Sequence, residues 1–130
     1  MKKMKHCWTD WMNPIKKGEI YLANLGDVKH TDIGKIRPVL VFQNDMLNRM
    51  VSDGLYNDVI VIPLSSKIRE NDFTLYLPKR DRLEKKSVIL CNAMKMISAK
   101  RLMTEEGVLT QLMPSEMEEI EKRVLLLLGI

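Results

Sequence analysis

The chain has 130 residues, of which 45% are hydrophobic and 29% are charged, and its 21 Lys and Arg residues exceed its 17 Asp and Glu residues by four. This composition is ordinary for one globular domain that buries its own core, and the mild positive charge permits a polyanionic partner without requiring one. The two cysteines, Cys7 and Cys91, exclude a disulfide scaffold and lack a zinc-ligand spacing, so we expect Cys91 to be a buried thiol.

The first 13 residues are predicted to be an appendage that precedes a single domain at residues 14–130. They carry both tryptophans, Trp8 and Trp11, and end at an Asn-Pro pair that marks a boundary. Their basic start is followed by polar residues and not by a long apolar run, so the sequence predicts no signal peptide. No apolar run approaches the roughly 20 residues that span a bilayer, and we expect a cytoplasmic protein without a membrane partner.

The first predicted strand covers residues 19–25, which are rich in strand-forming side chains and are closed by a Gly-Asp pair. A polar, glycine-containing loop over residues 26–36 follows. Residues 38–42 form a nearly continuous apolar run, which predicts a central strand buried on both faces, with Pro38 at its first position. Asp45 is expected to cap a short helical turn that reaches residue 50.

Three further strands are predicted downstream. Residues 58–64 and 87–91 are apolar runs typical of buried strands, whereas residues 73–77 alternate and should be half-exposed. The alternating stretch 93–97 is expected to continue the strand at 87–91. Methionines at apolar positions are expected to fill the core; these are Met46, Met50, Met94, Met96, Met103, Met113 and Met117.

The C-terminal segment has the period of a helix. Ser115 as the N-cap and Glu118 as its capping-box partner predict a helix over residues 115–128 that ends at Gly129. Many short strands without interleaved helices argue against a parallel sheet. The sequence therefore predicts an all-β fold with a C-terminal α-helix, a strongly curved antiparallel sheet of the SH3-like barrel type. The predicted apolar face of the helix consists of Met117, Ile120, Val124, Leu127 and Leu128.

The individual side chains give a weak chemical signal. The sequence has no paired-carboxylate, metal-ligand or Ser-His-Asp pattern, so we expect neither a metal nor a cofactor. His30 is either a general base, for which its ordinary pKa is suitable, or a solvated loop residue. Arg37 either pairs with Asp32 on the surface or binds a phosphate, and Ser65 either caps a turn or contacts that phosphate.

Short segments spread over residues 16–102 follow one another in a recognisable order. The chain has a basic-Gly-acidic start at residues 16–19, Arg-Pro-Val-Leu-Val at 37–41 with Gln-Asn-Asp at 43–45, and Pro-Leu-Ser-Ser at 63–66. Ser-Val-Ile-Leu at 87–90 and Lys-Arg-Leu at 100–102 come after them. Over most of residues 15–130 the sequence thereby resembles the MazF/PemK (Kid) family of toxin ribonucleases from type II toxin–antitoxin systems.

The resemblance implies an SH3-like barrel of the CcdB/MazF/Kid type that forms a homodimer. It also implies a sequence-selective, metal-independent endoribonuclease that cleaves single-stranded mRNA through attack of the 2′-hydroxyl group. A cognate antitoxin with an acidic, partly disordered segment would inhibit the enzyme. The residues that match the family's catalytic pair are Arg37, which would stabilise charge on the phosphate, and Ser65, whose hydroxyl would bind a phosphate oxygen.

Residues around this pair are expected to bind RNA through phosphate contacts and through unstacked bases. The acid–base pair of the PemK branch is replaced here by Leu90 and Asn92, whereas the MazF-type pair is present. Because the family's base-reading positions also differ, the recognised RNA sequence does not carry over. The expected RNA-binding residues are Lys29, His30, Thr31, Asp32, Lys35, Ser66, Lys67, Asn92 and Lys95.

Two other classes of function stay open at this point. A DNA gyrase poison of the CcdB type has the same kind of fold and needs a C-terminal Trp-Gly-Ile, whereas this chain ends in Leu128, Gly129 and Ile130. A non-catalytic SH3-like binding module would be favoured if Asn92 and Ala93 mark a site that has lost its chemistry. Cleavage of single-stranded RNA in EDTA separates both classes from the ribonuclease.

Overall fold

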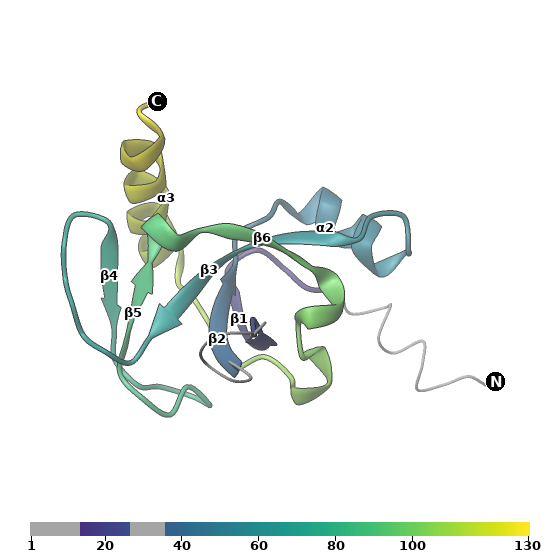
Figure 1. Cartoon of the computed structure of the whole chain (residues 1–130), viewed down its shortest axis with the longest axis horizontal. Coiled ribbons are helices and arrows are strands. Elements are labelled where there is room, and N and C mark those ends of the chain that lie inside the picture. The colour runs from purple at the N-terminus through teal and green to yellow at the C-terminus, as the bar shows by residue number, and fades with distance from the viewer. Residues whose placement is uncertain (1–13, 27–35) are drawn as a thin grey trace.

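The computed structural model describes residues 14–26 and 36–130, and the strands in these ranges form one curved antiparallel sheet (Figure 1). The strand order is β4-β5-β3-β2-β1-β7, and β6 also pairs with β3. Every strand pairing among the described residues is antiparallel, as predicted. The strands are β1 (Glu19–Asn24), β2 (Ile36–Val41), β3 (Asp58–Ser65), β4 (Thr74–Leu77), β5 (Ser87–Leu90), β6 (Lys95–Ser98) and β7 (Thr110–Gln111).

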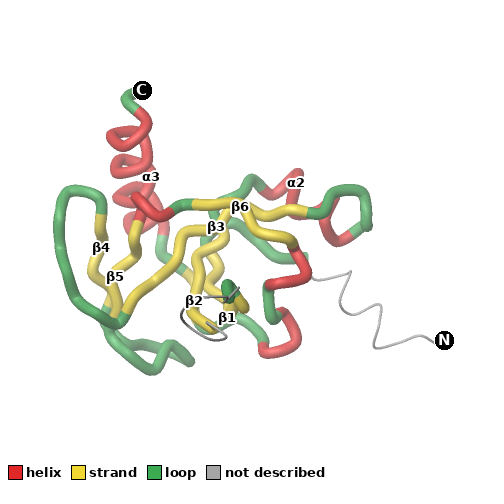
Figure 2. Tube along the Cα trace, viewed as in Figure 1, coloured by secondary structure: helices red, strands yellow, loops and turns green. Residues whose placement is uncertain are grey.

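The all-β architecture with a C-terminal helix that the sequence predicts is confirmed. Helix α3 (Pro114–Leu128) stands at one side of the sheet and covers one of its faces, and the short helix α2 (Asp45–Ser52) lies at the other end (Figure 2). Two short 3₁₀ turns, η2 (Ala99–Arg101) and η3 (Thr104–Glu106), connect β6 to β7. The predicted appendage at residues 1–13 and most of the predicted loop at residues 26–36 lie outside the described residues.

Strand β3 pairs with three neighbours, and this arrangement curves the sheet. One edge of β3 pairs with β2 along residues 61–63. The other edge pairs with β6 along residues 58–61 and with β5 at Leu64 and Ser65. Because β5 and β6 cover different halves of one strand, the sheet divides into two branches that leave β3 in different directions (Figure 2).

The predicted continuation of β5 through residues 93–97 is wrong. The chain leaves β5 in a 3₁₀ turn, η1 (Cys91–Ala93), in which the Met94 N–H donates to the Cys91 carbonyl at 3.2 Å. Strand β6 begins only at Lys95 and returns to the first half of β3. The turn therefore separates two strands that the alternating pattern had joined.

Alternate residues of β1, β2 and β3 point to opposite faces of the sheet and form two cores. Even-numbered residues of these strands pack under helix α3, whereas odd-numbered residues pack on the other face, with Ile97 and Leu102. Val39, Leu40 and Val41 are fully buried, so the prediction of a central strand covered on both faces is confirmed for these positions.

Helix α3 begins one residue earlier than predicted. Met113 is the N-cap and Pro114 takes the first helical position, where its missing N–H is not needed. The Glu116 carboxylate accepts a 2.8 Å bond from the Met113 N–H, so the cap predicted from Ser115 and Glu118 is wrong. The predicted end is confirmed, because Gly129 closes the helix in the left-handed conformation with φ of 74°.

The predicted apolar face of α3 holds only for its first turns. Ile120 and Val124 are buried in the core and Met117 packs against it. Leu127 and Leu128 are exposed by 36% and 55%, because the last turn extends beyond the sheet (Figure 1). The helix therefore ends in an apolar surface that the described chain does not cover.

Three of the seven methionines predicted to fill the core are on the surface. Met46, Met96 and Met113 are 70%, 52% and 54% exposed. Met46 lies on the outer face of α2, Met96 lies on an edge strand and Met113 is a helix cap. The other four, which are Met50, Met94, Met103 and Met117, are half-buried.

Gln43 and Asn48 form a buried polar network behind β2. The Gln43 amide donates to the Asn48 side chain at 3.2 Å and to the Asp58 carbonyl at 3.1 Å, and the Asn48 amide donates to the Gln43 carbonyl at 2.9 Å. Asn44 caps α2 by accepting from the Leu47 N–H at 2.9 Å, so the cap predicted at Asp45 is wrong. The Gln-Asn-Asp motif at residues 43–45 therefore fixes the corner between β2 and α2.

Candidate active-site groove

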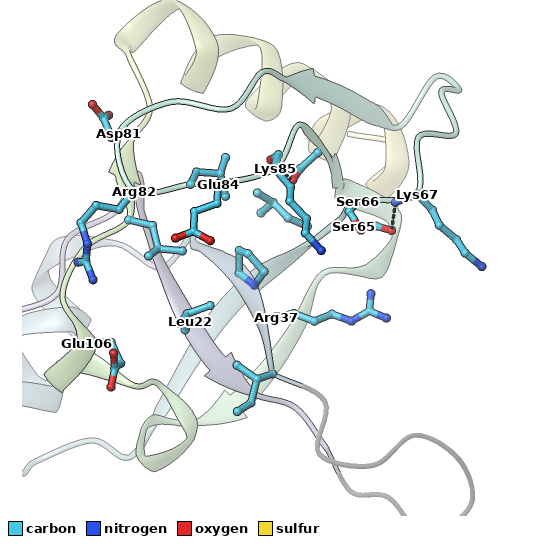
Figure 3. A pocket seen from close by; sticks show the side chains of 16 residues that line it. Leu22, Arg37, Ser65, Ser66, Lys67, Asp81, Arg82, Glu84, Lys85 and Glu106 are labelled. Atoms are coloured by element: carbon cyan, nitrogen blue, oxygen red, sulfur yellow. Dashed lines mark hydrogen bonds between the residues drawn. The ribbon is translucent and has the colours of Figure 1, made fainter.

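A groove of about 960 Å³ opens where β2 begins and β3 ends (Figure 3). The segment that connects β4 to β5, residues 78–86, forms the opposite wall, and we call this segment the strap. The apolar lining consists of Leu22, Ile36, Pro38, Leu64, Leu83 and Leu109, and the polar lining consists of Arg37, Ser65, Ser66, Lys67, Asp81, Arg82, Glu84, Lys85, Ser87 and Glu106.

Arg37 and Ser65 are brought together by the register of the β2–β3 ladder. The last pair of this ladder joins Val39 to Pro63. Extending the antiparallel register by two residues places Arg37 opposite Ser65, on the same face of the sheet. Both side chains point to the same end of the groove (Figure 3). Two residues that are 28 positions apart in the sequence thus share one site.

The Ser65 hydroxyl accepts a 3.1 Å bond from the Lys67 backbone N–H, drawn as a dashed line in Figure 3. This bond holds the turn that follows β3, so Ser65 caps a turn as one reading of the sequence predicted. A hydroxyl that accepts this bond still has its own proton to donate. The cap therefore orients Ser65 and leaves its O–H donor for a ligand in the groove.

The strap is fixed to the start of helix α3 through Arg80. The Arg80 guanidinium binds the Glu116 carboxylate in a two-bond fork of 2.8 and 2.9 Å and also donates to the Thr110 hydroxyl at 3.1 Å. The Thr110 hydroxyl in turn donates to the Asp81 carboxylate at 2.6 Å. Burial acts most strongly on Glu116 and opposes its ionisation, but the bonds from Arg80 and the Met113 N–H leave the pKa of Glu116 below its usual value.

Glu84 and Lys85 are groove residues that the sequence analysis missed. Both are exposed residues of the strap, and both point from it into the groove (Figure 3). The available signal was a dense run of charged residues at 79–86 directly before the buried strand β5. Lys85 lies at the same end of the groove as Arg37, Ser65 and Lys67, so basic charge collects there, whereas Asp81, Arg82 and Glu106 lie toward the other end (Figure 3).

The residues predicted to bind RNA fall into three groups: some line the groove, some lie outside it, and some lie outside the described residues. Ser66 and Lys67 line the groove next to Ser65. Asn92 in η1 and Lys95 at the start of β6 are exposed but do not line the groove, because the turn at η1 carries the chain away from it. Five predicted residues lie outside the described ranges and stay predictions, namely Lys29, His30, Thr31, Asp32 and Lys35. The alternative in which Arg37 pairs with Asp32 is untested for the same reason.

The buried thiol predicted at Cys91 is confirmed, and burial raises its pKa to about 11. Cys7 lies outside the described residues. Within residues 14–26 and 36–130, three or more His, Cys, Asp or Glu side chains do not gather closely enough to hold a metal ion. No helix in these ranges is long and apolar enough to cross a membrane.

A curved antiparallel sheet with a C-terminal helix is the fold of MazF-like proteins. The chain matches the family described as PemK-like, MazF-like toxins of type II toxin–antitoxin systems over residues 16–128. It therefore belongs to that family.

Solved structures with the same fold include proteins from mycobacteria and from Deinococcus radiodurans. An endoribonuclease in complex with its cognate antitoxin from a mycobacterial species has a TM-score of 0.69 and 19% identity, and the match covers 89% of this chain and 96% of that one. MazE–MazF from Deinococcus radiodurans has a TM-score of 0.71 and 18% identity, covering 91% and 98%. The Mycobacterium tuberculosis toxin MazF-mt6 has a TM-score of 0.65 and 20% identity, covering 86% and 97%.

Proposed function

We propose that the protein is a toxin endoribonuclease that cleaves single-stranded mRNA at selected sequences without a metal ion and is held inactive by a cognate antitoxin. Membership of the toxin family supports the class of activity. The observation that carries the assignment is the placement of Arg37 opposite Ser65 at the basic end of the groove. An RNA phosphate at this point would meet a fixed guanidinium and an oriented hydroxyl.

The proposed reaction uses the substrate's own 2′-hydroxyl as nucleophile. Its oxygen attacks the adjacent phosphorus and the 5′-oxygen of the next nucleotide leaves, which gives a 2′,3′-cyclic phosphate and a 5′-hydroxyl end. Charge grows on the non-bridging oxygens in the transition state, where Arg37 can donate two parallel bonds. Ser65 donates its hydroxyl proton to one of these oxygens while its bond from Lys67 keeps it in place.

The reaction also needs an acceptor for the 2′-hydroxyl proton and a donor for the leaving oxygen. A guanidinium does not serve as a base, because it stays charged at every ordinary pH. Two acidic residues of the strap line the groove. Asp81 lies toward its other end, whereas Glu84 points into the groove (Figure 3), and we assign Glu84 the role of proton acceptor. Lys85 adds positive charge beside the scissile phosphate, and the leaving 5′-oxygen takes its proton from solvent water in the open groove.

The test is incubation of the purified protein with a long single-stranded RNA in the presence of EDTA, followed by sequencing of the fragments. We expect cleavage at a small set of sequences, with cyclic-phosphate ends, at the same rate with or without EDTA. Cleavage that disappears with EDTA and returns with a divalent ion contradicts the metal-free route. Intact RNA under all conditions contradicts the enzyme and leaves a gyrase poison or a binding module.

The antitoxin is proposed to bind the same basic end of the groove through an acidic, partly disordered segment. Arg37, Lys67 and Lys85 offer complementary charge, and MazF-type structures have been solved with their antitoxins. Bound antitoxin and RNA should therefore exclude each other in a competition assay. Simultaneous binding of both would show that the antitoxin uses another surface.

A homodimer is the proposed assembly. The last turn of α3 exposes Leu125, Leu126 and Leu128 by 47%, 59% and 55%, followed by Ile130 at 86%. Leucines in sequence at a helix end are typical of a surface that another chain covers. Analytical ultracentrifugation at micromolar concentration should give twice the 15.1 kDa mass of one chain, and a species that stays at the mass of one chain would contradict this proposal.

A further inference from the structure

A second pocket lies beside the groove, on the outer side of the strap. Its volume is about 610 Å³, within the range of roughly 300–1,000 Å³ that is typical of small-ligand sites. The lining comes from the turn after β3, from strand β4 and from both ends of the strap. It consists of Ser66, Tyr76, Pro78, Lys79, Lys85 and Lys86.

The pocket and the groove share two of their lining residues. Ser66 and Lys85 line both, and Figure 3 shows them close together at the basic end of the groove, near Ser65. An RNA strand that leaves the groove at Ser65 would therefore pass between Ser66 and Lys85 into the second pocket. The pocket and the groove can thus bind neighbouring nucleotides of the same RNA.

Tyr76 gives the pocket an aromatic surface. It lies on β4, the outermost strand on its side of the sheet, and it is 42% exposed between Leu75 and the buried Leu77. The alternation of the strand turns Leu77 into the core and Tyr76 away from it. An exposed ring beside lysines is the arrangement on which unpaired bases stack in proteins that bind single strands.

The charge of the pocket also fits a polyanion. Lys79, Lys85 and Lys86 are exposed, and none of the described residues that line the pocket is acidic. This contrasts with the groove, whose lining mixes basic and acidic side chains. Basic side chains around an aromatic ring bind the phosphates and the base of one nucleotide without reading its identity.

We propose that this pocket is a flanking-nucleotide subsite, which binds the RNA nucleotide on one side of the scissile phosphate by stacking on Tyr76 and by phosphate contacts to Lys79 and Lys86. The inference rests on the proposed ribonuclease activity and specifies how far along the strand the enzyme holds its substrate. Because stacking does not depend on which base is present, the subsite adds affinity and leaves sequence selectivity to the groove.

The test compares three RNA substrates that contain a mapped cleavage sequence. One is an extended RNA, and the other two are the same RNA with an abasic nucleotide on the 5′ or on the 3′ side of the scissile phosphate, so that the 2′-hydroxyl and the leaving oxygen are kept. Tyr76→Ala should raise KM for the extended RNA about fivefold to a hundredfold, as expected for one stacked base. It should leave kcat and the cleavage sequence unchanged, and Tyr76→Phe should behave as the parent does. With the RNA that is abasic on the side bound by the subsite, parent and Tyr76→Ala should have equal KM values.

Binding without turnover provides a second measurement. The probe is a fluorescein-labelled 2′-O-methyl version of the extended RNA, which lacks the nucleophile. The double variant Lys79→Ala, Lys86→Ala should reduce the slope of log affinity against log salt by about 1.4, the value for two phosphate contacts to a single strand. Lys100→Ala, at an exposed lysine outside both cavities, should leave the slope unchanged.

The outcomes distinguish the subsite from the activity. If the parent cleaves RNA and neither Tyr76→Ala nor the lysine double variant changes KM or the salt slope, the subsite is wrong and the ribonuclease stands. If these variants weaken only the binding of the antitoxin, the pocket belongs to the protein partner, which also overturns the proposal. If the parent does not cleave or bind RNA at all, the proposed function fails first.

Discussion

Arg37 lies opposite Ser65 on the extension of the β2–β3 ladder, two residues beyond the last pair of Val39 and Pro63. The pairing of β2 with β3 therefore sets the relative position of two side chains from different parts of the sequence. Arg37 is the second residue of β2 and pairs with Ala23 of β1, and Ser65 is the last residue of β3 and pairs with Val88 of β5. Sites on strands are held more closely than sites on loops.

The first prediction concerns Arg37. Arg37→Ala should lower kcat for RNA cleavage about a hundredfold or more, as expected when one charge-stabilising group is removed from a transition state. Arg37→Lys should recover little, because an ammonium does not reproduce the two-bond fork. Initial rates and circular dichroism of both variants measure activity and fold. Arg49→Ala, at an exposed arginine of α2, is the matched control, and a parent-like rate for Arg37→Ala would remove this residue from the mechanism.

The second prediction separates the hydroxyl of Ser65 from its place in the turn. Ser65→Ala should lower kcat about tenfold to a hundredfold because the donor to the phosphate is lost, whereas Ser65→Thr should keep most of the activity. The bond from the Lys67 N–H is also lost in Ser65→Ala, so thermal unfolding should be measured with the kinetics. If Ser65→Ala is as active as Ser65→Thr, the hydroxyl only caps the turn.

The third prediction tests whether Glu84 accepts the proton of the 2′-hydroxyl group. Glu84→Gln keeps the shape of the side chain but removes the base, so kcat should fall about a hundredfold. The pH–rate profile of the parent should have an acidic limb that the variant lacks. Glu105→Gln, at an exposed glutamate of η3 outside the groove, should leave both quantities unchanged. A variant with lower kcat but an unaltered pH profile would mean that Glu84 positions the substrate and does not accept its proton.

The fourth prediction follows from the lowered pKa of Glu116. A carboxyl group whose pKa is lower in the folded state stabilises the fold above its unfolded pKa, and this contribution is lost as the pH falls through the folded value. The free energy of unfolding should therefore decrease as the pH drops below about 4. Arg80→Met should lower stability at neutral pH by about 1–3 kcal/mol and make this acid-side decrease smaller.

Urea denaturation at a series of pH values measures both effects. The exposed pair of Lys122 and Glu119, with side chains 71% and 44% exposed, provides the matched control. Lys122→Met should leave the free energy of unfolding at neutral pH close to that of the parent, because an exposed ion pair contributes little to stability. Equal pH dependence in the parent and Arg80→Met would show that the fork from Arg80 does not lower the pKa of Glu116.

The fifth prediction tests whether a motif of the family resemblance is structural. Asn48→Ala removes partners from the buried Gln43 side chain and carbonyl, so the free energy of unfolding should fall by about 1–3 kcal/mol. The specific activity of the folded protein should not change, because Asn48 does not line the groove. Asn57→Ala, at an exposed asparagine nearby in the sequence, should have little effect on stability. A large loss of kcat in Asn48→Ala would contradict the structural role.

Patterns of apolar residues in the sequence were sufficient to predict those helices and strands whose own residues form the core. The apolar run at residues 38–42 and the helical period after residue 114 predicted a central strand and α3 correctly. The turn at η1 was missed because a backbone bond from Met94 to Cys91 makes it, and side-chain alternation carries no sign of such a bond. The N-cap of α3 was predicted at Ser115 and is Met113, because proline favours the first position of a helix and Pro114 takes it.

The candidate site was only partly predictable for a different reason. Arg37, Ser65, Ser66 and Lys67 could be proposed from the resemblance, and all four line the groove. Glu84 and Lys85 could not, because the strap reaches the groove through the fork between Arg80 and Glu116, which are 36 positions apart in the sequence. A contact over such a distance leaves no local pattern, and the structure is needed to place the strap.

The fork between Arg80 and Glu116 also bears on the order in which a ribosome makes this protein. Synthesis proceeds from the N-terminus, so a nascent chain that has reached β7 already contains every residue that lines the groove. It does not yet contain Glu116, the carboxylate that fixes the strap, nor the helix that covers the first core. The groove therefore takes its final shape only after α3 has been made, which is later than all the residues that line it.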